Sequence, residues 1–367
     1  MNARIAIVGG GIAGLYAAMQ LQSRGIDDYM LLEAADHFGG RIETISAGPN
    51  DARFDLGATW FWPGIQPQLD RLVRELGIAR FAQHESGDTL IERAPGAPPV
   101  RVRGYANEPA SMRLAGGMSA LVDTMRSRLS MQRLRLDQRV THLGAATHSI
   151  EIQSINAQGN MSTHSVAHVL LALPPRLAST SIVFDPPLPE ALAQSWRDTP
   201  TWMAPHAKYL AVYPQAFWRE RGLSGAARSA SGPLTEIHDV STLEGAAALF
   251  GFIGIPADGR ARIGEPALLA ACRAQLIRLF GDEARDPHFE IIKDWTASRL
   301  SATAADRTAT PHHWHAPQSE AVAGSWRGRL AGIGSEWSAR YPGYVAGAID
   351  AVDAAIESIS LSRESRS

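Results

Sequence analysis

Three glycines near the start of the sequence have the spacing of a phosphate-binding turn. Gly9, Gly11 and Gly14 fill the pattern G-x-G-x-x-G between an apolar run at residues 5–8 and a helix-like stretch of small residues. The first glycine of this pattern makes a tight turn, the second lets a pyrophosphate approach, and the third lets the helix pack on the strand. The free N–H groups at the helix N-terminus, where Ala13 lies, favour an anionic ligand. The spacing therefore predicts a dinucleotide site.

A carboxylate follows where the ribose of a dinucleotide would lie. The run YMLLE predicts a second strand that ends at Glu33, 19 residues after Gly14. A carboxylate at this distance can accept hydrogen bonds from the ribose hydroxyls. A glycine-rich turn alone also occurs in other α/β folds, but the two features together favour a dinucleotide-binding domain. They do not distinguish NAD from FAD.

Composition and charge limit the classes of protein to consider. The chain has 367 residues, enough for roughly two domains, and its 45% hydrophobic and 20% charged residues are typical of a globular protein. A formal net charge of −2 gives no argument for binding nucleic acid or an anionic membrane. We therefore expect small-molecule partners. Cys272 is the only cysteine, which excludes an internal disulfide, and its helix-like surroundings predict a core position.

The sequence also gives an expectation for location. The first predicted strand begins at about Arg4, which leaves no room for a secretory signal. No apolar run approaches the roughly 20 residues of a membrane span. We therefore expect a cytoplasmic protein, and nothing in the sequence indicates its oligomeric state.

Several motifs, taken together, resemble the flavin-containing amine oxidase family, which includes monoamine and polyamine oxidases. The first is EAADHFGGRIET, with Gly40 and Arg41 in the family's Gly-Gly-Arg motif. Further blocks follow in the family's order: FDLGATWFWPG, LAGGMSALVDTMRSRL, LRLDQRVTHL, HVLLALPPRL and LAGIGSEWSARYPGYVAGAIDAV. The resemblance spans nearly the whole chain and favours FAD over NAD. Beyond the first motif, it implies cofactor contacts at Gly57, Ala58, Thr59, Trp60, Val140, Glu336 and Gly343.

The resemblance implies an α/β fold of two domains. A discontinuous Rossmann-type FAD-binding domain would comprise residues 1–78, 113–183 and 318–359. A smaller α+β substrate domain with a mixed sheet would comprise residues 79–112 and 184–317, and residues 360–367 would be a polar tail.

An amphipathic helix is predicted to begin near Gly343. Its apolar face contains residues that recur every three or four positions: Val345, Ile349, Val352, Ile356 and Ile359. If its positive N-terminal end points at the flavin, it would stabilise the anion formed on reduction. A purely structural helix has the same periodicity, so the role facing the flavin rests mostly on the resemblance.

The chain contains 35 lysines and arginines, and only two of them, Lys208 and Lys293, are lysines. Lys208 lies in MAPHAKYLAVYPQAFWRE, which resembles the family segment whose lysine holds a water beside flavin N5. An ammonium group there would help oxygen take electrons from the reduced flavin. The alternative is a strand lysine that extends to solvent. Lys293 is predicted to be peripheral.

The sequence also departs from the family pattern. Monoamine oxidases commonly place two aromatic side chains against the flavin, and Tyr344 stands at one of these positions. The positions of the flavin-linking cysteine and of the second aromatic residue fall at about Ala304 and Ala305. We therefore expect non-covalent FAD and an incomplete aromatic pair.

Other aromatic and histidine residues are weaker pocket candidates. Trp60, Trp62 and Trp337 are nearly as well explained as core residues, and His313 lies in the run PHHWHAP. The three histidines of this run have no defined metal-ligand spacing, so no metal site is expected.

The expected reaction moves a hydride from the carbon next to an amine nitrogen onto flavin N5. The resulting imine is hydrolysed to an aldehyde or ketone, and O2 is reduced to H2O2. No side-chain base is required if the amine binds neutral, so activity would rise with pH through the pKa of the amine. Two alternatives remain: an FAD-dependent desaturase or dehydrogenase that acts on a C–C bond with another electron acceptor, and a non-catalytic protein that uses FAD structurally.

Overall fold

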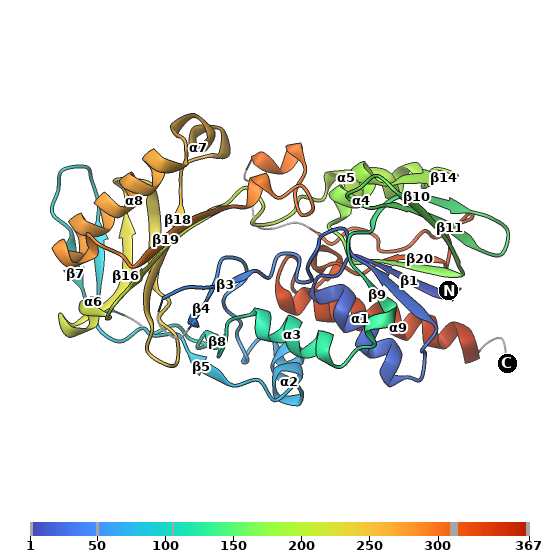
Figure 1. Cartoon of the computed structure of the whole chain (residues 1–367), viewed down its shortest axis with the longest axis horizontal. Coiled ribbons are helices and arrows are strands. Elements are labelled where there is room, and N and C mark those ends of the chain that lie inside the picture. The colour runs from blue at the N-terminus through green and yellow to red at the C-terminus, as the bar shows by residue number, and fades with distance from the viewer. Residues whose placement is uncertain (1–2, 49–50, 105, 309–314, 365–367) are drawn as a thin grey trace.

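A parallel sheet with a second sheet packed on it forms one end of an elongated molecule, and a mixed sheet forms the other end (Figure 1). The computed structural model describes residues 3–48, 51–104, 106–308 and 315–364. The chain crosses between the two ends several times, so each end is assembled from segments that are distant in sequence.

A parallel sheet with five described strands forms one end, and its strand order is β20-β13-β1-β2-β9. The strands are β1 (Ile5–Val8), β2 (Tyr29–Leu32), β9 (Leu134–Arg135), β13 (His168–Leu171) and β20 (Leu330–Gly332). Nearly all of their residues are buried, as expected for parallel strands covered on both faces. The strand predicted at residues 5–8 is confirmed, and so is the strand that leads into Glu33.

Helices cover this sheet and build its larger core. They are α1 (Ile12–Ser23), α2 (Pro67–Glu75), α3 (Ser119–Ser127) and α9 (Val345–Glu364). The predicted C-terminal helix is confirmed, and Ile349, Val352 and Ile356 of its apolar face are buried in this core. The helix begins at Val345, two residues after Gly343. Both residues line a cavity between the two ends of the molecule, so the helix N-terminus lies at the wall of that cavity.

A second, four-stranded sheet packs against the first sheet on its other face. It contains β10 (Arg139–Ala145), β11 (Ile150–Ile155), β12 (Met161–Val166) and β14 (Val183–Asp185), with α4 (Pro175–Ser181) and α5 (Glu190–Asp198) beside it. Trp337 lies in this core, where its ring meets Trp196 at 5.4 Å, and it does not line the cavity. Trp337 thus occupies the core position that the sequence left open as the alternative to the substrate pocket, and a Cβ on Gly332 would lie 2.2 Å from its ring.

The other end of the molecule is a mixed sheet of seven described strands, ordered β19-β15-β18-β17-β16-β6-β7. The strands are β6 (Asp88–Glu92), β7 (Val100–Val102), β15 (Ala207–Tyr213), β16 (Leu223–Ser229), β17 (Leu234–Asp239), β18 (Ala247–Ile253) and β19 (Phe289–Asp294). Only β6 and β16 run parallel to each other; the other pairs are antiparallel. The mixed sheet expected from the sequence is present.

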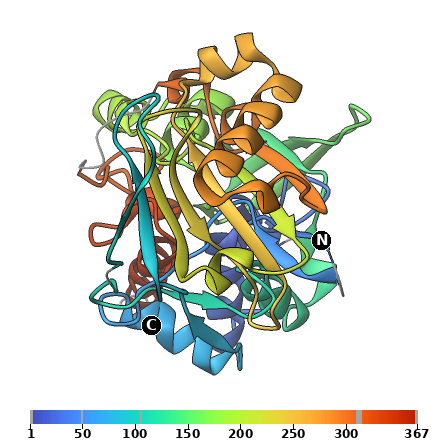
Figure 2. The same cartoon turned by 90° about the vertical axis from the view of Figure 1, so that its left-hand side faces the viewer.

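Helix α8 (Glu265–Phe280) lies across the outer face of this sheet (Figure 2). Cys272 is buried between them, as predicted. The remaining elements are short: α6 (Phe217–Glu220), α7 (Ala257–Ile263), β3 (Thr44–Ser46), β4 (Arg53–Asp55), β5 (Arg80–Ala82), β8 (Met112–Leu114), and the 3-10 turns Met131–Arg133, Asp282–Ala284, Trp295–Ala297, Ala304–Arg307 and Ser335–Trp337. In the described part of the chain, no helix is long and apolar enough to cross a membrane.

Gly14 and Gly11 give a matched test of the first turn. A Cβ atom on Gly14 would lie 1.9 Å from the Gly9 carbonyl oxygen, whereas one on Gly11 would meet nothing closer than 3.7 Å. We expect Gly14→Ala to lower the free energy of unfolding by about 1–3 kcal/mol, because the clash outweighs the better helix propensity of alanine. Gly11→Ala should cost less than about 1 kcal/mol. Urea denaturation checks both, and equal losses would contradict this account of the turn.

Candidate active site

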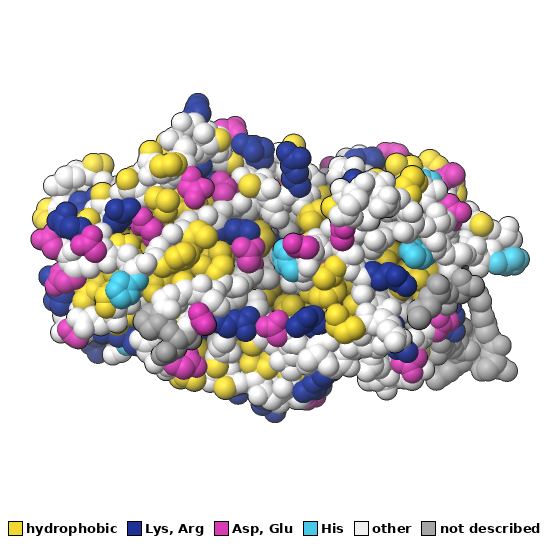
Figure 3. Space-filling view, viewed as in Figure 1, with side chains coloured by type: hydrophobic (Ala, Val, Ile, Leu, Met, Phe, Trp, Pro, Cys, Tyr) yellow, Lys and Arg dark blue, Asp and Glu magenta, His cyan; other side chains and the backbone are white. Residues whose placement is uncertain are grey.

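A cavity of about 1480 Å³ lies between the two ends of the molecule. It is larger than the usual small-molecule pocket and has room for a dinucleotide together with a substrate. Apolar side chains gather in the hollow of the face shown in Figure 3. The walls come from the first glycine turn, from the segment around residues 57–60 and from the inner face of the mixed sheet.

The structure brings most of the predicted cofactor residues to the cavity wall. Those that line it are Gly9, Gly11, Ala13, Glu33, Gly40, Arg41, Gly57, Ala58, Thr59, Trp60, Val140 and Gly343. Gly14 instead packs against the Gly9 carbonyl, and Glu336 is fully buried behind the wall. Lys208, Tyr344 and Trp62 also line the cavity, while His313 lies outside the described residues.

The first turn fits a dinucleotide. Gly11 lines the cavity, and because it has no side chain its backbone stays accessible there; a Cβ would make only ordinary contacts, the nearest at 3.7 Å from the Gly39 carbonyl oxygen. Glu33 lies at the end of β2 and accepts hydrogen bonds from the Gly10 and Ala35 N–H groups at 2.5 and 2.7 Å. Burial raises the pKa of the Glu33 carboxyl, and these hydrogen bonds oppose the rise. The carboxyl group is thus fixed beside the turn, as recognition of a ribose requires.

Arg41 is held by Glu336 rather than by solvent. Its guanidinium donates to the two carboxylate oxygens of Glu336 at 2.5 and 2.9 Å and to Ser335 Oγ at 3.1 Å. Such a two-point ion pair fixes the plane of the guanidinium. Glu336 itself does not line the cavity; its carboxylate orients Arg41, which does.

Lys208 is the central charged group of the wall. It lies on β15, and its side chain is buried. Its ammonium donates to the Gly57 carbonyl at 2.5 Å and to Thr59 Oγ1 at 2.9 Å, and it lies 4.7 Å from the centre of the Phe250 ring. Two of its three N–H groups are thus used, which leaves the third for a ligand or water in the cavity. Burial lowers the pKa of Lys208 to about 8.

Two further charges lie near Lys208: Asp55, in the sequence block FDLGATWFWPG, and Arg113, which no motif singled out. Asp55 on β4 accepts hydrogen bonds from Thr44 Oγ1 at 2.6 Å and the Met118 N–H at 2.8 Å. Burial raises the pKa of the Asp55 carboxyl and lowers that of the Arg113 guanidinium. The Asp55 carboxylate favours a protonated Lys208, and Arg113 disfavours it.

Lys293 is not peripheral, contrary to the prediction from the sequence. It stands directly opposite Lys208 in the pairing of β15 with β19, and it lines the cavity. Its ammonium pairs with Glu43 at 2.5 Å and lies 4.7 Å from the centre of the Trp295 ring. The sequence spacing could not reveal this, because the two lysines meet only through strand pairing. The Glu43 pair offsets the repulsion expected between like charges on facing strands.

Tyr344 has an aromatic neighbour that the sequence did not indicate. The Trp202 ring lies 4.6 Å from the Tyr344 ring, and the Trp62 ring meets Tyr344 edge-on at 6.2 Å. All three residues line the cavity. Gly343 has φ of 82°, and a Cβ there would approach Trp202 to 3.0 Å, so glycine permits this arrangement. Ala304 and Ala305 do not line the cavity.

Comparison with known proteins agrees with this site. The model of the flavin containing amine oxidoreductase family matches residues 96–355, and that of the NAD(P)-binding Rossmann-like domain matches residues 7–76. The chain therefore belongs to the family of flavin-containing amine oxidoreductases and is a flavin-dependent oxidoreductase. One relative is the Dictyostelium discoideum protein described as "probable flavin-containing monoamine oxidase A". It is 25% identical to this chain, and the match covers 94% of this chain and 95% of that protein.

Solved structures show the same fold. Wild-type putrescine oxidase bound to putrescine superposes with a TM-score of 0.79, at 21% identity, over 98% of this chain and 99% of that one. Cyclohexylamine oxidase from Brevibacterium oxydans IH-35A superposes with a TM-score of 0.81, at 18% identity, over 99% of this chain and all of that one. The cavity wall with its open glycine turn thus fits the flavin cofactor of the family.

Asp55→Asn tests the charge balance around Lys208. Asparagine retains an oxygen for Thr44 and Met118 but removes the charge, so we expect the pKa of Lys208 to fall below about 8, by about one unit or more. In a Lys293→Arg background, NMR titration of isotope-labelled lysine in the flavin-free protein reports Lys208 alone. Asp27→Asn, at an exposed carboxylate paired with Arg133, is the control. An unchanged titration midpoint in Asp55→Asn would contradict the coupling.

Proposed function

We propose that the protein binds FAD non-covalently and oxidises a small-molecule amine with O2 as the electron acceptor. FAD, when bound, would supply the redox chemistry: a hydride acceptor for the carbon next to the amine nitrogen and a path for the two electrons to O2, so that the products would be an imine, which water hydrolyses, and H2O2. The observation that carries the proposal is the buried Lys208 ammonium, held at the cavity wall with one N–H group left for a ligand.

FAD rather than a mononucleotide is supported by the length of the lined path. The walls continue from Lys208 along Gly57 and Arg41 to the glycine turn and Glu33, where a pyrophosphate and a ribose would lie. The N-terminus of α1, which begins at Ile12, presents free N–H groups at that end. The N-terminus of α9 supplies a second positive end, beside Gly343 and Tyr344.

Non-covalent binding is supported by the position of the only cysteine. Cys272 is fully buried in the core under α8 and does not line the cavity. Ala304 and Ala305, where the family pattern would place a linking cysteine and an aromatic residue, have no reactive group. No thiol is therefore placed to bond to a flavin in this cavity.

An amine substrate is supported by the aromatic group of Trp62, Trp202 and Tyr344 in the cavity wall. Aromatic ring faces attract a substrate nitrogen and its attached C–H bonds. Trp202 beside Tyr344 provides a second ring where the sequence indicated only one. An incomplete aromatic pair would favour the alternative, a desaturase or dehydrogenase acting on a C–C bond, so the second ring weakens the case for that alternative.

The division of the chain into domains is part of the same proposal. The mixed sheet is built from strands within residues 79–112 and 184–317, and the parallel sheet from strands within 1–78, 113–183 and 318–359. We propose these ranges as the substrate domain and the FAD-binding domain.

Anaerobic spectroscopy tests the reaction. We expect the flavin spectrum to bleach on addition of one class among primary amines, secondary amines and polyamines. Omission of the amine is the control. A flavin spectrum that no amine changes would contradict the proposal and favour the C–C desaturase or a structural role for FAD.

Lys208→Met tests the choice of electron acceptor. The loss of a preorganised positive charge beside the flavin should slow reoxidation of the amine-reduced flavin by O2 about a hundredfold. Reduction by the amine should change much less. Stopped-flow mixing of the reduced protein with O2 measures the rate, and Lys293→Met is the matched variant on the facing strand. Equal reoxidation of wild type and Lys208→Met would favour a dehydrogenase.

A further inference from the structure

Six residues form one row across the inner face of the mixed sheet. Each stands directly opposite the next in the pairing of β19, β15, β18, β17, β16 and β6, in the order Lys293, Lys208, Phe252, Glu236, Arg228 and Ile91. Directly paired residues point to the same face of a sheet, and all six line the cavity. The row is therefore a continuous stretch of the cavity wall that leads away from Lys208.

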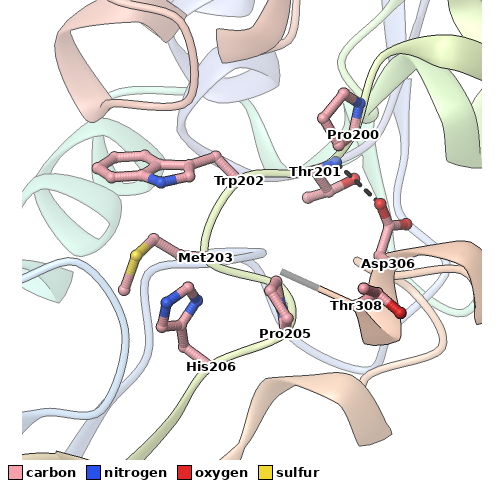
Figure 4. A pocket seen from close by; sticks show the side chains of 8 residues that line it. All are labelled: Pro200, Thr201, Trp202, Met203, Pro205, His206, Asp306 and Thr308. Carbon is pink, nitrogen blue, oxygen red and sulfur yellow. Dashed lines mark hydrogen bonds between the residues drawn. The ribbon is translucent and has the colours of Figure 1, made fainter. Parts of the chain in front are cut away.

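The Lys208 end of this row is the end where the amine is proposed to react. Lys208 follows six residues after Trp202 of the aromatic group, so one segment of the chain carries both side chains to the cavity. Figure 4 shows Trp202 and Met203 extending to the same side of this segment, away from Asp306. Asp306 accepts a hydrogen bond from the Thr201 N–H at 3.0 Å, which anchors the segment from behind.

Phe252 separates Lys208 from Glu236. Neighbouring strands lie about 4.8 Å apart, so Glu236 stands two strands, or about 10 Å, from Lys208 along the sheet. The Lys208 ammonium lies 5.5 Å from the centre of the Phe252 ring. The ring gives the wall an apolar surface on which methylene groups can pack. From Lys208 onward, the wall thus presents an apolar surface and then a carboxylate.

Glu236 has one carboxylate oxygen without a partner among the residues that the structure describes. Oε1 lies 3.2 Å from His238 Nε2 and 3.6 Å from Arg228 Nη2, whereas Oε2 has neither contact. The His238 ring is held between Trp60 at 5.0 Å and Phe250 at 5.4 Å, so its contact fixes the carboxylate. The hydrogen bond with His238 also holds the pKa of Glu236 below its usual value. The ionised Oε2 is therefore open to a donor in the cavity.

The other carboxylates of the cavity wall are taken up by protein partners. Glu33 accepts from backbone N–H groups, Glu43 pairs with Lys293, Glu85 accepts from Asn107, and Asp239 pairs with Arg219. The Arg228 side chain, by contrast, is 63% exposed, and so weak and solvated an ion pair contributes little. Glu236 is thus the carboxylate of this wall that is best placed to bind a cation from the cavity.

We propose that Glu236 is a specificity-determining residue that binds a second, distal ammonium group of the amine substrate, an inference that rests on the amine oxidation proposed above. The substrate is then a chain with two amines. Its reacting nitrogen lies at the Lys208 end, its methylene groups pack on Phe252, and its distal ammonium donates to Glu236 Oε2. Arg228 is the next residue of the row, and its positive charge disfavours a third ammonium group beyond the second. A diamine is therefore preferred over a longer polyamine.

A matched set of substrates tests the proposal. The unbranched diamine that bleaches the flavin at the lowest concentration is compared with the monoamine of equal length, in which a methyl group replaces the distal ammonium. Under anaerobic conditions, the half-saturating concentration in the wild type should be about tenfold or more lower for the diamine, because a hydrogen bond between two charged groups is lost with the monoamine. An amino alcohol of equal length has a distal donor without a charge and should behave like the monoamine.

Glu236→Gln should remove this preference. We expect the half-saturating concentration of the diamine to rise about tenfold or more, that of the monoamine to stay unchanged, and the limiting rate of bleaching to change little. Glu236→Asp should restore part of the preference. Glu290→Gln is the matched control, because Glu290 is also a carboxylate of the mixed sheet paired with an arginine, Arg273, but does not line the cavity.

A triamine tests the limit set by Arg228. Its half-saturating concentration in the wild type should be higher than that of the diamine, and Arg228→Gln should abolish the difference. A triamine that half-saturates the wild type at a lower concentration than the diamine would contradict this limit.

The outcomes separate this proposal from the one on which it rests. Equal effects of Glu236→Gln on diamine and monoamine would indicate a structural role and overturn the proposal. A wild type that does not distinguish the diamine from the monoamine or the amino alcohol would also overturn it, even if no variant folded, while the oxidation of amines would stand. If no amine bleaches the wild type, the amine oxidation itself fails.

Discussion

The buried ammonium of Lys208 is the constraint on which the cavity wall depends. Removing an ammonium from water is costly unless hydrogen bonds and nearby charges compensate. Gly57 and Thr59 supply the hydrogen bonds, and Asp55 supplies the opposite charge. Because Gly57 and Thr59 lie in a loop beside the parallel sheet while Lys208 lies in the mixed sheet, this one side chain links the two ends of the molecule.

Other contacts repeat this link around the cavity. Lys293 of the mixed sheet pairs with Glu43, and the Trp295 indole donates to the Leu56 carbonyl at 3.1 Å. These contacts converge on the segments 41–43 and 56–59, of which residues 41–43 and 57–59 line the cavity. The mixed sheet is thus held in a fixed position over the proposed flavin site. Preorganisation of this kind is what a cofactor enzyme contributes, since the cofactor carries the redox chemistry.

The sequence predicted the parts of the site that depend on local geometry. The first turn, the strand before Glu33 and the helix after Gly343 are each specified within about 30 residues, because glycine conformation and apolar periodicity act over short distances. Trp202 was missed and Lys293 was misplaced because their positions arise from strand pairing and from packing between distant segments. The ion pair of Glu336 with Arg41 could not be predicted, since it depends on side-chain geometry.

The identity and attachment of the cofactor test the central claim most directly. The purified protein is denatured in acid, the precipitate is removed, and the flavin in the supernatant is identified by chromatography and mass spectrometry. This account predicts that the supernatant contains FAD, about one molecule per chain, and that the precipitate is colourless. Flavin retained by the precipitate would contradict non-covalent binding. A mononucleotide, or a protein that neither contains FAD nor takes it up, would contradict the assignment of the cavity that runs from the glycine turn to Lys208.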